Sequence, residues 1–180
     1  PVRPFKGTAW LAVRPDASQV VTLSGSAARE LSVRTWPAGD LLTGPVATCE
    51  SAAWSRDGTT LAIGKGDGTI QLWRTGTWFK EIAFAGDSLP IRSLAFSPDD
   101  QTLAGQCQNG TVKLWNVVTG RELMTLAAHA NTPSQIFFSP DGTMLGSAGL
   151  SASAGSPSEL LLWYAPFGHD EAPPATQQGP

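Results

Sequence analysis

Four aspartates recur at one place in a repeated phrase, at Asp16, Asp57, Asp99 and Asp141. Carboxylates can act as general acids, general bases or metal ligands where two or more of them converge. Here each one follows a short apolar run and closes a tetrad such as Phe-Ser-Pro-Asp. An Asp in that position predicts a turn, because its side chain can accept hydrogen bonds from the backbone of its own turn. Since the four lie in separate repeats, we expect no paired catalytic carboxylates.

The other residues that could do chemistry are few and scattered. The chain has two histidines, His129 and His169, and two cysteines, Cys49 and Cys107. Their spacing matches no zinc-binding pattern. His169 stands in a polar segment as part of a solvated charge cluster, and the cysteines are expected as free, buried thiols, which favours a reducing, cytoplasmic location. The sequence thus predicts no enzyme, no metal and no cofactor within this chain.

The amino-acid composition limits which folds and which partners can be expected. Apolar residues make up 41% of the 180 residues and charged residues 15%, with 19 Gly, 14 Pro and seven Trp. This balance favours many short strands separated by turns. The net charge is -3 without a Lys/Arg cluster, so nucleic acid is not expected as a partner. No run of 18 apolar residues is present, so no membrane-spanning helix is expected.

A repeat of about forty residues organises the chain. The apolar anchors Val13, Trp54, Phe96 and Phe138 are spaced by 41, 42 and 42 residues. In two repeats a Trp follows its anchor by 19 residues. The turn signals between apolar runs predict four strands per repeat. For the third repeat these are 91–97, 102–107, 111–117 and 122–127.

The repeated phrases resemble those of WD40 repeats. They are Phe-Ser-Pro-Asp followed by Leu-Ala, and then Asp/Asn-Gly-Thr-(Ile/Val)-x-Leu-Trp, and they cover roughly residues 7 to 164. The resemblance implies an all-β fold, a partial β-propeller of about four blades with four antiparallel strands each. We expect blades at 7–47, 48–88, 89–130 and 131–165, the last without its own outer strand, and a polar, Pro-rich tail at 166–180. The Ala-rich sequence with its Ser-Pro-Asp-Gly turn is similar to bacterial WD40 proteins.

The resemblance also assigns structural roles. In the family a His, a Ser or Thr, a turn Asp and a third-strand Trp form a hydrogen-bonded tetrad within a blade. The positions that match are Trp36, Trp73, Trp115, Trp163, Asp67, Asn109, His129 and Ser147. Because no blade has all four residues, we expect apolar packing to hold the blades together. Trp10 and Trp78 fall outside the pattern and either make exposed contacts or cover a neighbouring blade.

WD40 propellers usually close with seven blades, of which four repeats supply a little over half. In closed rings the last blade commonly takes its outer strand from the N-terminal end of the chain. We therefore expect further blades of the same chain upstream of Pro1. Without them, the terminal blades would expose apolar faces and the protein would self-associate.

Function is expected on the surface. Loops that enter the first strands, and loops between second and third strands, gather on one face of a propeller. Residues expected on this "entrance face" are Glu50, Lys65, Asp67, Arg92, Gln108, Asn109, Ser134 and the 149–158 insertion. Mixed charge beside an adaptable loop suits a protein or peptide partner, and so predicts a non-catalytic scaffold or protein-interaction domain. The alternative is the C-terminal sensor or docking propeller of a larger bacterial signalling protein, such as a serine/threonine protein kinase.

Overall fold

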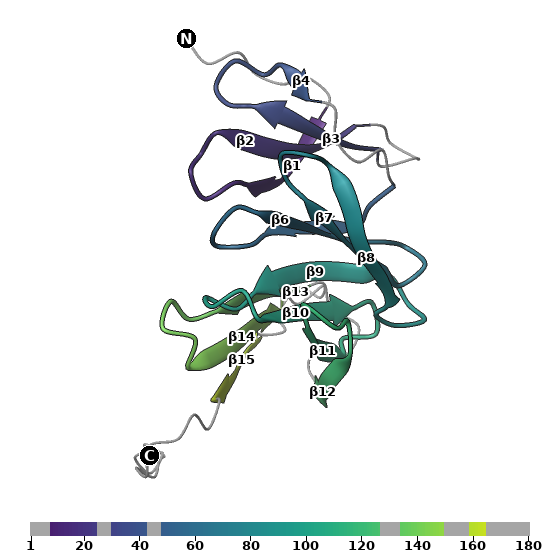
Figure 1. Cartoon of the computed structure of the whole chain (residues 1–180). Coiled ribbons are helices and arrows are strands. Elements are labelled where there is room, and N and C mark those ends of the chain that lie inside the picture. Colours follow the sequence, from purple (N-terminus) through teal and green to yellow (C-terminus); the bar gives the residue numbers. More distant parts are fainter. Residues whose placement is uncertain (1–7, 25–29, 43–47, 127–133, 150–158, 165–180) are drawn as a thin grey trace, which may run out of the picture.

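The computed structural model describes residues 8–24, 30–42, 48–126, 134–149 and 159–164. Within them the chain is all-β, with its strands in four antiparallel sheets (Figure 1). The first sheet, blade 1, holds β1 (Thr8–Val13), β2 (Gln19–Ser24), β3 (Glu30–Thr35) and β4 (Leu41–Leu42). Blade 2 holds β5 (Ser51–Trp54), β6 (Thr60–Gly64), β7 (Thr69–Arg74) and β8 (Phe79–Ala85). Blade 3 holds β9 (Ile91–Phe96), β10 (Thr102–Cys107), β11 (Val112–Asn116) and β12 (Glu122–Leu126). Blade 4 holds β13 (Ser134–Phe138), β14 (Met144–Gly149) and β15 (Glu159–Tyr164).

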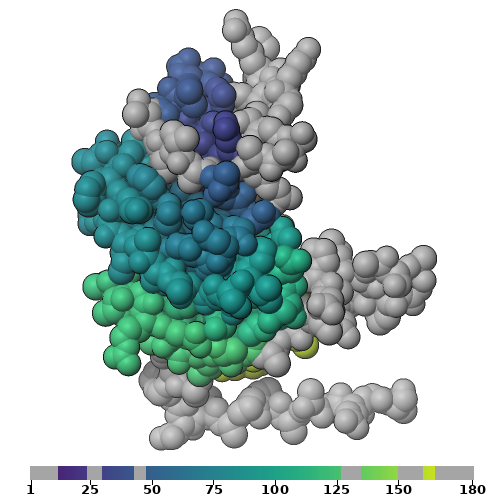
Figure 2. All heavy atoms as spheres, turned by 90° about the vertical axis from the view of Figure 1, so that its right-hand side faces the viewer, coloured from purple at the N-terminus to yellow at the C-terminus, as the bar shows by residue number. Residues whose placement is uncertain are grey.

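The four blades are stacked in the order of the sequence. Each first strand contacts the first strand of the next blade, so that β1, β5, β9 and β13 run side by side. In the space-filling view the described atoms form one continuous stack from purple-blue through teal to green (Figure 2). This is the arrangement of a partial β-propeller, in which each blade buries its faces against its neighbours. The predicted fold class is confirmed, including a last blade with three described strands.

Turn chemistry explains why the second strands start where they do. In blade 3, the Ser97 hydroxyl donates to Asp99 at 2.5 Å, and the Asp99 carboxylate accepts the backbone N–H of Gln101 at 3.1 Å. The backbone N–H groups of Ser18, Thr59 and Thr143 donate in the same way to Asp16, Asp57 and Asp141. The predicted turn role of the four aspartates is therefore confirmed.

The core lies between blades and not within a single sheet. On β10, Leu103 and Cys107 pack in one cluster with residues of blade 2, whereas Ala104 packs in another with Ile136 and Leu145 of blade 4. Because β10 is covered on both faces, every residue after Thr102 is buried, including the polar Gln106. Both cysteines are free and buried, as predicted.

Three of the four repeat tryptophans occupy equivalent places. Trp73, Trp115 and Trp163 lie in the third strands, and each pairs with the second residue of its second strand: Leu61, Leu103 and Leu145. In blade 1 the register differs from the expectation. Trp36 lies one residue beyond the end of β3, and Arg34, paired with Val20, takes the equivalent position. The sequence spacing is misleading there because the connection between β2 and β3 has no Asp-Gly or Asn-Gly pair like those of blades 2 and 3.

Two of the residues matched to the tetrad, Asp67 and Asn109, make local turn bonds. Asp67 accepts the backbone N–H of Thr69 at 2.9 Å, and Asn109 accepts that of Thr111 at 3.1 Å. The indole of Trp115 is fully buried without a hydrogen-bond partner among the described residues. Ser147 is fully buried in β14. His129 lies outside the described residues.

Blade 4 leaves one face uncovered by the described chain. Phe137, Leu160 and Leu162 expose between 44 and 58% of their surface. Ile136 and Trp163, adjacent to two of them, face blade 3, so the alternation of strand side chains directs this row to the opposite side. The predicted self-association stays a prediction, and this apolar row is its structural basis.

Trp78 packs against the apolar cluster between blades 1 and 2 instead of making an exposed contact. Its ring meets that of the buried Trp54 edge-on, with centroids 6.1 Å apart. Trp10 lies in β1, and its side chain falls outside the described part of the structure.

Candidate functional site

The entrance face brings together charged residues that are distant in sequence. Glu50 directly precedes β5, and Arg92 is the second residue of β9. The Arg92 guanidinium nevertheless lies 2.5 Å from the Glu50 carboxylate and bridges blades 3 and 2. Its other terminal nitrogen donates to the Gln108 side chain at 3.1 Å. These three residues form a continuous polar chain across the junction of two blades.

The β6–β7 turn adds a second ion pair to the same face. The Lys65 ammonium lies 3.5 Å from the Asp67 carboxylate. The Glu50 side chain lies against this turn, because a Cβ on Gly66 would come within 3.6 Å of it. The turn and the Glu50–Arg92 pair therefore form one surface.

Backbone bonds fix this surface in place. The N–H of Ile91 donates to the Lys65 carbonyl at 3.2 Å, and the Ser51 hydroxyl donates to the Ile91 carbonyl at 2.7 Å in a buried position. The N–H of Gln108 donates to the Pro90 carbonyl at 2.9 Å. Arg92 is thus held from both sides of its strand start, which reduces the conformational entropy that a partner must remove on binding.

Electrostatics keep the face charged but balanced. The backbone N–H of Thr69 and the nearby Lys65 lower the pKa of Asp67 below its usual value. At the outer side of the same blades, Lys113 contacts both Asp87 (3.3 Å) and Glu122 (3.0 Å), and these partners raise its pKa. Each cation in these pairs has an anion beside it.

Two predicted parts of the face are only partly described. Ser134 opens β13, and its side chain is outside the described residues. Of the 149–158 insertion, only Gly149 belongs to a described strand. The structure therefore brings together Glu50, Lys65, Asp67, Arg92 and Gln108, and it places Asn109 in the turn next to Gln108. The Ser134 side chain and residues 150–158 lie outside the described part.

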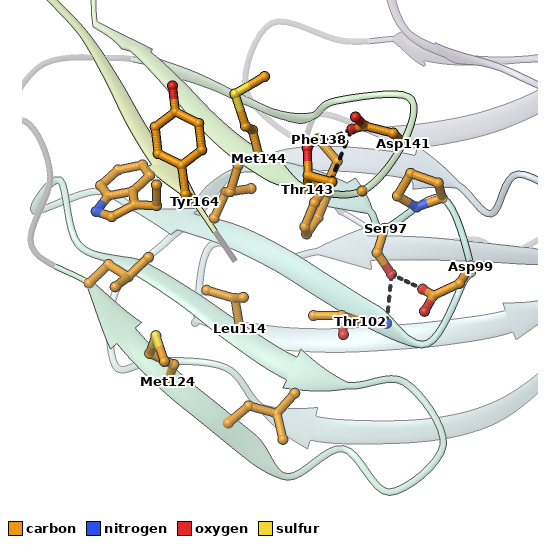
Figure 3. Close-up of a pocket in the computed structure, with 16 residues that line it drawn as sticks. Ser97, Asp99, Thr102, Leu114, Met124, Phe138, Asp141, Thr143, Met144 and Tyr164 are labelled. Atoms are coloured by element: carbon orange, nitrogen blue, oxygen red, sulfur yellow. Dashed lines mark hydrogen bonds between the residues drawn. The ribbon is translucent and has the colours of Figure 1, made fainter. Parts of the chain in front are cut away.

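The sequence analysis missed a cavity between blades 3 and 4. It has a volume of about 830 Å³ and lies between β12, the start of β14 and the end of β15 (Figure 3). Most of its lining is apolar, with two turn carboxylates: Leu114, Leu123, Met124, Leu126, Phe138, Met144, Leu145, Trp163, Tyr164, Asp99 and Asp141. The available signal was the pair Leu123-Met124, in which two large apolar residues replace the Glu81-Ile82 of the preceding blade.

The described residues carry no group of three or more His, Cys, Asp or Glu side chains that could hold a metal ion. Within the same part of the chain, no helix is long and apolar enough to cross a bilayer.

Comparison with known proteins identifies the repeats. The sequence model of the family described as "WD domain, G-beta repeat" matches residues 39–74 and 80–116. No curated protein matches the sequence. Among solved structures, a chain of one titled "Crystal Structure of Mitotic Checkpoint Complex" is similar at a TM-score of 0.73 and 18% identity. The similarity covers 91% of this chain and 52% of that one, so the present chain spans about half of its length. The matched residues 39–74 and 80–116 are therefore WD40 repeats, and the stacked four-stranded sheets have the fold of a partial WD40-like β-propeller.

Proposed function

We propose that this chain is a non-catalytic protein-interaction module that recognises a protein or peptide through its entrance face. The observation that carries the proposal is the set of linked polar side chains Glu50, Arg92 and Gln108, which extends across two blades. It offers donors and acceptors from a rigid scaffold, with Arg92 still 37% exposed at its side chain. Arginine presents a planar fork of donors and is enriched in protein interfaces.

Balanced charge favours a protein over a polyanion. Arg92 and Lys65 are each paired with a carboxylate, so the face carries no surplus positive charge for a phosphate backbone. Polar groups of a protein partner can form hydrogen bonds with the residues of these pairs at a solvated rim. Glu50 and Asp67 would instead repel an acidic polymer.

The uncovered face of blade 4 supports a further proposal about partners. Its exposed apolar row matches in kind the faces that pack between blades 2 and 3. We infer that additional blades of the same protein pack there, and that the interaction module is part of a larger propeller.

The test is affinity capture from cells of the source organism, followed by mass spectrometry, with the wild type and Arg92→Glu. Arg121→Glu is the matched control, because it makes the same charge change on an exposed residue of a turn in blade 3. We expect Arg92→Glu to lose partners that Arg121→Glu retains.

A charge swap separates binding from folding. Glu50→Arg combined with Arg92→Glu restores an ion pair with its direction reversed. We expect the double variant to regain the wild-type unfolding midpoint and still lose the partners. If Arg92→Glu keeps every partner, the entrance face is not the recognition surface.

A further inference from the structure

The space between blades 2 and 3 that is equivalent to the cavity beside β12 is filled by side chains. There, Phe84 of β8 packs against the indole of Trp115 with ring centroids 6.2 Å apart, and Trp115 is fully buried. A Cβ on Gly120 would come within 2.8 Å of the Phe84 ring, so the turn after β11 closes over it. The equivalent space is filled by the chain itself.

One sequence difference and one difference in burial distinguish the space between blades 3 and 4. Strand pairing makes Leu126 the equivalent of Phe84, since they lie opposite Val112 and Ile70 respectively. Leucine is smaller than phenylalanine, and Trp163 is only partly buried, unlike Trp115.

The mouth of the cavity also carries more exposed apolar surface than its counterpart. Met124, the equivalent of the half-buried Ile82, is 53% exposed. Leu123, which is 55% exposed, stands where blade 2 has Glu81, a residue that forms an ion pair with Arg74. Exposed apolar residues grouped around a concave site are typical of a binding site.

The charged part of the lining indicates what the occupant carries. Ser97 and the backbone of Gln101 bind one oxygen of Asp99, and Ser139 and Thr143 bind one oxygen of Asp141. These bonds lower the pKa of both carboxylates and keep them ionised at neutral pH. The second oxygen of each makes no hydrogen bond within the described residues. Figure 3 shows Asp99 and Asp141 on one side of the cavity and Met124 on the other.

We propose that this cavity is a second binding site, for a partner's peptide segment that carries a large apolar side chain next to an arginine or lysine. The apolar side chain lies among Met124, Leu126 and Trp163, and the cationic group binds the free oxygens of Asp99 and Asp141. A cation fits these positions because, within the described residues, no Lys or Arg lines the cavity to neutralise the two carboxylates. This site is separate from the entrance face and does not depend on it.

A phage-displayed library of random heptapeptides on the full chain tests the proposal. Met124→Glu serves for counter-selection, and Val118→Glu is the matched control, because Val118 is an exposed apolar residue of blade 3 outside the cavity. We expect the enriched peptides to carry Arg or Lys beside Leu, Phe or Trp. Their affinity, measured by fluorescence anisotropy, should fall about tenfold or more with Met124→Glu and stay unchanged with Val118→Glu.

Two further measurements test the role of charge in peptide binding and the specificity of binding for this site. Asp141→Asn, which keeps the turn oxygen and removes the charge, should weaken binding severalfold, and changing the peptide's cation to Glu should abolish it. Arg92→Glu should leave peptide binding unchanged, so that failure here and failure of the entrance face can be told apart.

Several outcomes would overturn the proposal. One is a library that yields no peptide sensitive to Met124→Glu, and another is enrichment of acidic peptides. A dimer in sedimentation velocity that Met124→Glu dissociates assigns the cavity to a second copy of the chain. Peptide binding that occurs only after deletion of residues 166–180 assigns it to the protein's own C-terminal segment.

Discussion

Asp100 of blade 3 accepts a 2.6 Å hydrogen bond from the backbone N–H of Arg56 in blade 2, and its second oxygen accepts that of Asp57 at 3.0 Å. Asp100 holds a left-handed backbone, with φ at 58°, where blades 2 and 4 have Gly58 and Gly142. A non-glycine residue in this conformation costs about 1–2 kcal/mol. The contact with blade 2 offsets that cost and joins two neighbouring turns.

This double role predicts an order of stability among variants of Asp100. Asp100→Gly removes both bonds but relieves the strain, and we expect a loss of about 1–2 kcal/mol in the free energy of unfolding. Asp100→Ala removes the bonds and keeps the strain, so we expect a loss larger by about 1 kcal/mol. Urea unfolding followed by tryptophan fluorescence measures both. Equal stability of the Ala variant and the wild type would show that the contact contributes nothing.

The tight packing of Gly105 under Trp115 gives a second prediction. A Cβ on Gly105 would lie 2.7 Å from the indole and 3.1 Å from Leu94. Because Trp115 is fully buried it cannot move aside freely, and we expect Gly105→Ala to destabilise the protein by about 1–3 kcal/mol.

Gly66→Ala is the control for that substitution. A Cβ there meets only the Glu50 side chain, at 3.6 Å, which is an ordinary contact. We expect a change within about 0.5 kcal/mol in the same urea measurement. Similar losses for the two variants would mean that Gly105 is not held by the indole.

The sequence predicts those features of the structure that are determined by residues close together in the chain. The strands of blade 3 begin and end within one residue of the expectation, because Pro98-Asp99 and Asn109-Gly110 fix both turns within a few residues. Trp36 was expected in the third strand of blade 1 only because of its spacing from Val13, and it lies one residue beyond β3.

Contacts between blades were harder to predict. That Glu50 and Arg92 share a face follows from the repeat, whereas their 2.5 Å contact depends on how two sheets are rotated against each other. The cavity depends on the size difference between Phe84 and Leu126, which has meaning only after the blades are aligned in space. Hence the fold and turn roles were predictable, and the second site was not.

Cys107 is predicted to be chemically inert in the folded protein. Burial, with the nearby Asp87 carboxylate as the next cause, raises the pKa of its thiol to about 12. At pH 8.5 the thiolate is therefore a negligible fraction, and only the thiolate reacts. We expect no alkylation of Cys107 by iodoacetamide at this pH in the native protein, and full alkylation in urea, as measured by peptide mass spectrometry. Rapid native labelling would show that β10 opens readily to solvent.

Acid should weaken the propeller through its turn carboxylates. The hydroxyl of Ser97 and the backbone N–H of Gln101 lower the pKa of Asp99 from its ordinary value of 3.8, and equivalent bonds lower those of Asp57 and Asp141. A carboxyl whose pKa is lower in the folded state stabilises that state fully above its unfolded pKa. The stabilisation is lost as the pH falls through the folded pKa.

We therefore expect the urea midpoint, as far as these carboxylates set it, to be constant between about pH 7 and 5 and to fall below about pH 4. Asp99→Asn keeps an acceptor for the Gln101 N–H but cannot titrate, so it should lower the midpoint at pH 7 and flatten the decline in acid. The comparison is a series of urea titrations of both proteins from pH 7 to 3. A wild-type midpoint that does not change over this range would show that the carboxylates have the same pKa in the folded and unfolded chain, and that their turn bonds contribute no net stability.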